Sequence, residues 1–142
     1  MRRLALLAAV ALAATACAGG SGTDRSGATA LAAPEVAVPV IATFEVAGGE
    51  RFKVLLTHAD DIATAQRLLA GEDAPGIPNG RLVRETGVNV DWSWSLDPDD
   101  IEFADTTIEA CDGLPSDVEA GILTGDRYCP WSAVVVAVDP AP

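Results

Sequence analysis

Apolar and polar residues alternate along two neighbouring segments of the chain. In residues 35–48, valine, alanine and phenylalanine recur at every second position, which is typical of a strand with one buried face. Residues 51–56 repeat the alternation and place three large apolar side chains on one side: Phe52, Val54 and Leu56. Because only the short sequence GGE separates the segments, they predict an antiparallel hairpin, with Pro39 at an edge or a bend of the first strand.

The period of the apolar positions then changes to that of a helix. Apolar residues recur three and four positions apart, acidic residues precede them and Gly71 follows, so we expect one short helix over about residues 60–70. The inward side chains would be Ile62, Ala65, Leu68 and Leu69. After this helix, the sequence predicts a loop at 72–80 and strands at 81–85 and 88–96. The sequence DPDD (97–100) predicts a break, and residues 101–111 predict a partly extended stretch. A helical turn is expected after Pro115, and a buried last strand at 131–140. One short helix among several strands predicts an α+β domain with a mainly antiparallel sheet.

The first residues carry the pattern of an export signal. Arg2 and Arg3 precede an apolar run that ends at Ala16, well short of the roughly 20 residues that a membrane-spanning helix needs. We therefore expect a signal peptide over residues 1–16.

Cys17 follows Ala14, Thr15 and Ala16, and this ending resembles a bacterial lipobox, in which the cysteine is diacylated. The lipobox favours Leu where this chain has Ala14, so ordinary cleavage followed by secretion is the alternative. Residues 17–34 are rich in Gly, Ala, Ser and Thr and predict a flexible spacer, which leaves residues 35–142 as one domain.

The charge balance excludes some partners. The chain has 9 basic and 21 acidic side chains, and its formal net charge of −12 becomes −14 when Arg2 and Arg3 leave with the signal. Such a surface repels nucleic acid and anionic lipid, so we expect no nucleic-acid partner, and membrane contact through the acyl anchor only. If Cys17 is lipidated, the remaining cysteines, Cys111 and Cys129, can pair as a disulfide in an oxidising compartment.

Groups for catalysis or metal binding are sparse. His58 is the only histidine, no serine lies in a GxSxG motif and no CxxC motif occurs, so we expect no enzyme, no cofactor and no metal site. The acidic side chains at Asp97, Asp99, Asp100, Glu102 and Asp105 do not fit an EF-hand. We expect Asp97 to cap a turn and the others to face water.

The three tryptophans carry a second candidate chemistry. Trp92 and Trp94 lie two positions apart and would share one face of a strand, where core packing is the expected role and a stacking platform for sugars is the alternative. Trp131 follows Cys129 by two residues and is expected to pack on the disulfide.

The segment from Trp92 to Trp131 resembles a family of small secreted or surface domains, named after the N-terminal domain of a calmodulin-binding protein. The matching residues are Trp92, Trp94, Leu96, Asp97, Pro98, Phe103, Ile108, Glu109, Cys111, Asp112, Gly113, Pro115, Cys129, Pro130 and Trp131. The likeness covers residues 37–138, and Ser95 stands where many members have His. The resemblance implies no established activity, and the predicted helix, with Arg67 as its single basic residue, does not suit calmodulin.

These observations predict a non-catalytic, lipid-anchored extracytoplasmic module that binds an unknown macromolecular partner. Its candidate interaction surface consists of Trp92, Trp94, Asp97, Asp99, Asp112 and Trp131. One alternative is a protease inhibitor that presents a stiff loop at 72–80 or 116–125. A second alternative is a calcium-dependent adhesion or carbohydrate-binding domain.

Overall fold

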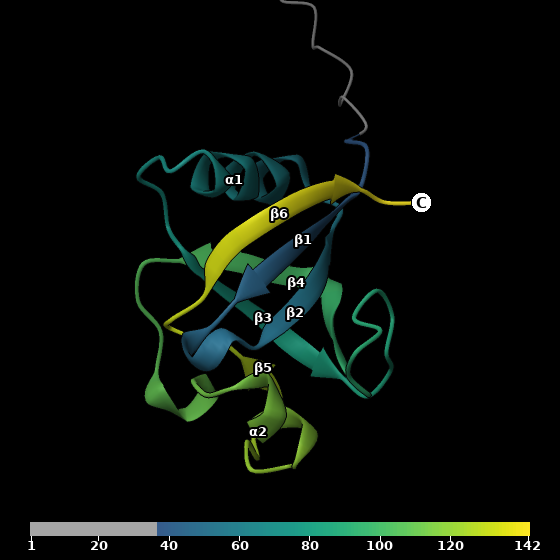
Figure 1. Cartoon of the computed structure of the whole chain (residues 1–142), viewed down its shortest axis with the longest axis vertical. Coiled ribbons are helices and arrows are strands. Elements are labelled where there is room, and N and C mark those ends of the chain that lie inside the picture. Colours follow the sequence, from purple (N-terminus) through teal and green to yellow (C-terminus); the bar gives the residue numbers. More distant parts are fainter. Residues whose placement is uncertain (1–36) are drawn as a thin grey trace, which may run out of the picture. The chain divides into compact units, whose positions relative to one another are not determined.

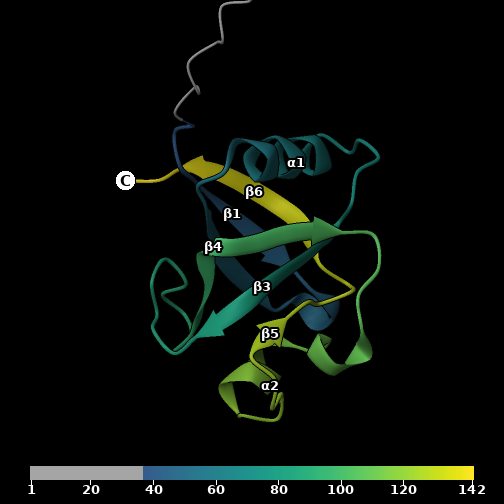
Figure 2. The ribbon, with the colours of Figure 1, turned by 180° about the vertical axis from the view of Figure 1, so that it is seen from behind.

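The computed structural model describes residues 37–142, and all structural statements concern this part of the chain. The predicted signal peptide, Cys17 and the predicted spacer lie outside the described residues. The described chain forms two three-stranded antiparallel sheets, in the orders β2-β1-β6 and β4-β3-β5. In Figures 1 and 2 the sheets lie one behind the other, with α1 near one end and α2 near the opposite end. The predicted α+β class is confirmed.

The first sheet contains the predicted hairpin. Strands β1 (Val40–Glu45) and β2 (Arg51–Leu56) pair with Phe44 opposite Phe52, and the turn between them places two glycines at positive φ. Strand β6 (Val134–Pro140) pairs with β1 alone and forms an edge of the sheet. The prediction that β6 is buried was wrong: its residues are exposed or half-buried, and only side chains such as Val135 and Val138 pack against the core.

The second sheet differs most from the sequence prediction. Strand β3 (Ile77–Val83) begins inside the predicted loop 72–80, and β4 (Ser95–Ala104) runs through the predicted break at residues 97–100. The register of β4 against β3 shifts there, from Ile101 opposite Gly80 to Leu96 opposite Leu82. The intervening DPDD residues form a bulge without register partners in β3, and such a position tolerates proline because no ladder hydrogen bond is required of it. Strand β5 (Arg127–Tyr128) pairs with the other edge of β3.

The predicted strand at residues 88–96 is a turn over most of its length. Asn89 is buried, and its side chain accepts a hydrogen bond from the Lys53 amide (2.9 Å) and donates one to the Trp94 carbonyl (3.0 Å). The Trp92 amide in turn donates to the Asn89 carbonyl at 3.0 Å. Because these bonds offer the backbone an alternative to strand pairing, the chain becomes extended only at Ser95.

The helices agree with the sequence. Helix α1 (Ala59–Leu69) buries Ile62 and Ala65 as predicted, whereas Leu69 is exposed because it lies in the last turn. The predicted turn after Pro115 is helix α2 (Pro115–Glu119), and a short 3-10 helix, η2 (Glu109–Cys111), precedes it. Among the described residues, no helix is both long and apolar enough to cross a membrane.

Between the sheets lies a core of aromatic rings. Phe52 from β2 meets Tyr128 from β5 with ring centroids 5.3 Å apart, and Trp94 meets Tyr128 at the same distance, both edge to face. Phe44 stacks on Phe52 at 5.2 Å. These fully buried rings join β1 and β2 of one sheet to β5 of the other and to the turn before β4, and thereby hold the loop that carries the cysteines against the sheets.

Candidate binding groove beside the disulfide

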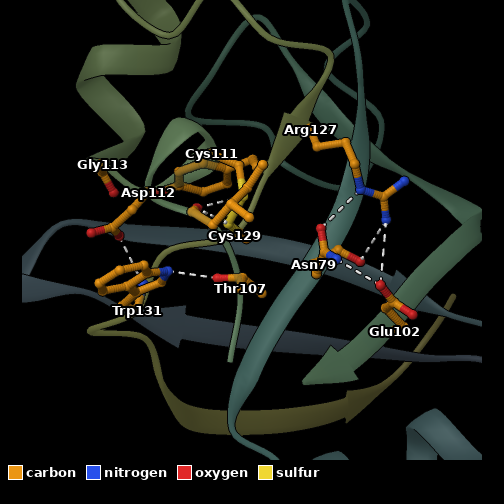
Figure 3. The surroundings of a disulfide bond; sticks show 11 residues. Asn79, Glu102, Thr107, Cys111, Asp112, Gly113, Arg127, Cys129 and Trp131 are labelled. Atoms are coloured by element: carbon orange, nitrogen blue, oxygen red, sulfur yellow. Dashed lines mark hydrogen bonds and ion pairs between the residues drawn. A yellow bond between two sulfur atoms is a disulfide. The ribbon is translucent and has the colours of Figure 1, made fainter. Parts of the chain in front are cut away.

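Cys111 and Cys129 form the predicted disulfide, with their Cα atoms 5.1 Å apart. Both residues are buried, and the Cys129 amide donates a hydrogen bond to the Cys111 carbonyl at 2.8 Å (Figure 3). The Tyr128 hydroxyl beside them donates to the Gly113 carbonyl at 3.1 Å. Burial, assisted by nearby carboxylates, raises the pKa of the Tyr128 phenol above its ordinary value, so the phenol stays neutral and keeps this bond.

Trp131 is held at two points but half of its side chain faces solvent. Its amide donates to Asp112 Oδ1 at 2.8 Å, and its indole Nε1 donates to the Thr107 hydroxyl. The preceding Pro130 is fully buried, while Trp131 is 45% exposed. The ring is therefore positioned before any ligand arrives. Packing of this ring on the disulfide stays a prediction.

Three polar side chains meet on the outer face of the second sheet. Asn79 lies on β3, Glu102 on β4 and Arg127 on β5; their neighbours Gly80, Ile101 and Tyr128 are buried, so strand alternation turns these three outward. Asn79 Nδ2 donates to Glu102 Oε1 at 2.6 Å, and Arg127 Nε donates to Asn79 Oδ1 at 2.9 Å. We call these three residues the polar trio (Figure 3).

Two hollows share the segment that connects β4 to η2 as part of their lining. The larger, of about 320 Å³, is lined by the polar trio together with Ile108, Ala110, Cys111 and neighbouring residues. The smaller, of about 190 Å³, is lined by Ile77, Asp105 and Trp131. Thr106 and Thr107 line both. We call the combined feature the Thr107 groove, and Figure 3 shows Thr107 between Trp131 and the trio.

The charges around the groove are mainly negative. Glu102, Asp105 and Asp126 line it, and the one cation among its lining residues is Arg127. Arg127 Nη1 donates hydrogen bonds to both carboxylate oxygens of Asp100, to Oδ1 at 3.0 Å and to Oδ2 at 3.1 Å. Most of the wall is apolar, formed by Ile108, alanine side chains and the disulfide. The groove thus combines an exposed ring, an apolar wall and a few fixed polar groups, which is the usual composition of a binding site.

A family model described as the BP-74 N-terminal domain matches residues 38–142. The chain belongs to this family. The match spans both sheets, the disulfide and the groove, and it confirms the resemblance inferred from the tryptophan and cysteine motifs. Neither a comparison with curated proteins nor one with solved structures gave a match.

In this BP-74 N-terminal domain the predicted surface residues separate into three places. Trp131 lines the smaller hollow, and Asp112 accepts a hydrogen bond from its backbone amide without lining either hollow. Asp97 and Asp99 lie on the bulge of β4 and line neither hollow. The Asp99 amide donates to Asp97 Oδ1 at 3.1 Å, which is the predicted cap, and Asp97 also pairs with Arg81. No group of three or more metal-ligating side chains occurs in the described part of the chain.

Trp92 and Trp94 form a third group at the core. Trp94 is fully buried, and its Nε1 has no hydrogen-bond partner among the described residues. Trp92 is half-buried, stacks on Trp94 with ring centroids 6.3 Å apart, and donates from Nε1 to the Arg51 carbonyl at 2.8 Å. The pair therefore belongs to the packing of the BP-74 N-terminal domain, and the platform of two exposed tryptophans considered from the sequence is wrong.

Sequence reasoning missed Asn79, Arg127 and Thr107, and it considered Glu102 only as part of an acidic run. Asn79 lay in a predicted loop, and Arg127 lies in a strand of two residues, too short to give an alternating pattern. The one available signal was Glu102, which stands between Ile101 and Phe103 and therefore should face outward from a strand. Its partners depend on strand register, which the sequence does not contain.

Proposed function

We propose that this BP-74 N-terminal domain is a non-catalytic, extracytoplasmic binding module. It is tethered to the membrane through lipid on Cys17 and binds its ligand in the Thr107 groove. The single observation that carries the binding role is Trp131: a large ring, fixed through Asp112 and Thr107, that nevertheless stays half exposed in the lining of the smaller hollow. Large aromatic rings at concave surfaces are typical anchors of binding sites.

The disulfide supports the same role. It fixes the wall of the larger hollow at Cys111, and it holds Cys129 two residues before Trp131. A groove that is rigid before binding loses little conformational entropy when the ligand arrives, so more of the contact energy contributes to affinity. A disulfide also suits a compartment outside the cytoplasm, in agreement with the signal pattern at residues 1–16.

A binding role agrees better with the groove than a catalytic one. The groups of the polar trio hold one another, and His58, the only histidine, lines neither hollow. Within the described residues, no histidine, cysteine thiol or serine is paired with a base at the groove, so the usual means of activating a nucleophile is missing there.

Two exposed isoleucines allow a matched test of the binding surface. Ile108 is 71% exposed and lines the larger hollow, whereas Ile122 is 66% exposed and lines neither hollow. A photo-crosslinking amino acid is placed at one position or the other in the full-length chain, and whole cells are irradiated. We expect that the chain with the crosslinker at position 108 becomes covalently joined to a molecule of the cell envelope. The chain with the crosslinker at position 122 should give little crosslinked product. Equal yields at both positions, or no product at 108, would contradict the proposal.

The tether is tested separately. Cys17→Ser should move the protein from the membrane fraction to the soluble extracytoplasmic fraction. The melting temperature should stay unchanged, because the two sheets and their core are built from residues 40–140. Continued membrane association of the Cys17→Ser chain would contradict a lipid anchor.

One observation favours the protease-inhibitor alternative. Ile122 is exposed on the loop closed by the disulfide, directly after Gly121 at φ +71°. Rigid loops with an exposed apolar side chain can occupy a protease cleft. Inhibition of serine or cysteine proteases that is lost in Ile122→Asp but kept in Ile108→Asp would favour this function. The other candidate inhibitor loop, residues 72–80, is a loop only in its first part, because β3 begins at Ile77.

A further inference from the structure

Trp131 presents a ring face of the kind that sugars use. Asp112 fixes its backbone amide and Thr107 its indole N–H, so the ring cannot turn away without breaking the hydrogen bond to Thr107. The C–H groups on one face of a hexose ring form an apolar patch that packs on such a ring. Because the ring is already held, little rotamer entropy is lost on contact.

The polar side of the groove offers both donors and acceptors. Glu102 Oε1 accepts from Asn79, while Oε2 accepts no hydrogen bond from any described residue. The Thr107 hydroxyl accepts from Trp131, and its own hydrogen can still be donated. Asn79 Nδ2 uses one of its two hydrogens on Glu102. The groove therefore has at least one vacant acceptor and two available donors.

This mixture matches hydroxyl groups better than it matches a basic side chain. A hydroxyl donates one hydrogen bond and accepts others, so neighbouring sugar hydroxyls can pair with Glu102 and with Thr107 or Asn79 at once. A lysine or arginine side chain only donates. It would satisfy Glu102 and leave the donors of Thr107 and Asn79 without partners, which is unfavourable once water is excluded.

The charge of the groove excludes acidic ligands. Three carboxylates line it, and the guanidinium of Arg127 is already paired with Asp100. A uronate, sulfate or phosphate would meet this negative field without a free cation among the lining residues. The ligand should therefore carry no negative charge.

We infer that the Thr107 groove binds a neutral carbohydrate. One sugar ring packs on Trp131 in the smaller hollow, and the hydroxyls of the next sugar bond to Asn79 and Glu102 in the larger. This inference rests on the proposed function, because it names the ligand of the same groove.

The test uses the exported Cys17→Ser chain on a glycan array that holds neutral hexose, deoxyhexose and N-acetylhexosamine oligosaccharides beside uronate and sulfated ones. The best array ligand is then titrated by calorimetry. We expect neutral glycans to bind and acidic ones to bind at least about tenfold more weakly. Trp131→Ala and Glu102→Ala should each weaken binding by about tenfold or more, as is common for anchor residues.

Controls separate loss of contact from loss of fold. Trp131→Phe keeps a ring and should retain part of the affinity, and Ile122→Ala lies outside the groove and should bind normally. Each variant is used only if its melting temperature matches that of the parent. Glu102→Gln gives a further readout, because the amide keeps one acceptor and should bind better than Glu102→Ala.

Two results would overturn the inference. The first is a neutral-glycan set without any binder. The second is glycan binding that Trp131→Ala and Glu102→Ala leave unchanged, because the sugar would then lie elsewhere. Crosslinking at position 108 to a protein, together with no glycan binding, would overturn the carbohydrate assignment and leave the proposed binding function standing. Absence of both would overturn both.

Discussion

Removing the disulfide should destabilise the domain without unfolding it. The bond joins residues 18 positions apart and closes a loop that contains α2 and β5. In the chain-entropy model, a loop of this length contributes about 3 kcal/mol, because the unfolded chain regains its freedom when the bond is absent. For a domain of this size, that loss corresponds to a melting temperature lower by roughly 10–15 °C.

Other contacts should keep the variant folded. Tyr128 remains fully buried between the aromatic rings of the core, and Ser116 remains bonded to Glu50 on the far side of the loop. The double variant Cys111→Ala/Cys129→Ala, built on Cys17→Ser so that no free thiol is left, should therefore show a cooperative transition at the lower temperature.

Thermal melts by circular dichroism measure the melting temperature, and urea titrations measure the free energy of unfolding and the m-value. The free energy of unfolding should fall by about 3 kcal/mol, and the urea m-value should rise slightly because the unfolded chain exposes more surface without the crosslink. The parent with its disulfide reduced under denaturing conditions serves as the matched comparison. An unchanged melting temperature would refute the reasoning, because it would mean that the loop is held without the bond.

Three further changes test other parts of the structure. Glu50→Ala removes the carboxylate that accepts hydrogen bonds from the Ser116 amide (2.9 Å) and hydroxyl (2.8 Å) at the start of α2. The free energy of unfolding, measured by urea titration, should fall by about 1–2 kcal/mol. An unchanged value would show that this cap does not stabilise the domain. Burial raises the pKa of Asp61 above its ordinary 3.8, so the folded state binds the proton more tightly and this group's contribution to stability falls as pH rises through that region. Asp61→Asn should therefore gain stability relative to the parent between pH 3 and pH 7 in urea titrations, and a constant difference would contradict the raised pKa. Gly80→Ala would place a Cβ 2.6 Å from Ile101 Cδ1. Thermal melts should show that the free energy of unfolding falls by about 1–3 kcal/mol. An unchanged melting temperature would show that the neighbouring side chains can move to accommodate the methyl group.

Features with a local or compositional cause could be predicted from the sequence. The hairpin of β1 and β2 follows from period-two alternation on both sides of a glycine turn, and α1 follows from the change to a helical period. The disulfide follows from the cysteine count, and the family follows from motifs that lie close together in the chain. Each of these features depends on the residue pattern of a short segment or on the number of cysteines, so it can be predicted without knowing which distant residues are in contact.

Features that depend on strand register were decided only by the tertiary structure. The sequence 97–100 resembles a loop, yet it is a bulge inside β4 because the flanking residues Leu96 and Ile101 both pair with β3. Trp92 and Trp94 were expected in a strand, but Asn89 turns the chain by bonding to Lys53, far away in the sequence.

The groove is the clearest case of this dependence. Glu102 is 23 positions from Asn79, and Arg127 is 48 positions from it. Each is an ordinary polar residue in its own segment, and they become one site because three antiparallel strands align at one register. A shift of a single residue would turn any of them to the opposite face of the sheet. The sequence determined which side chains were available, and strand pairing decided which of them meet.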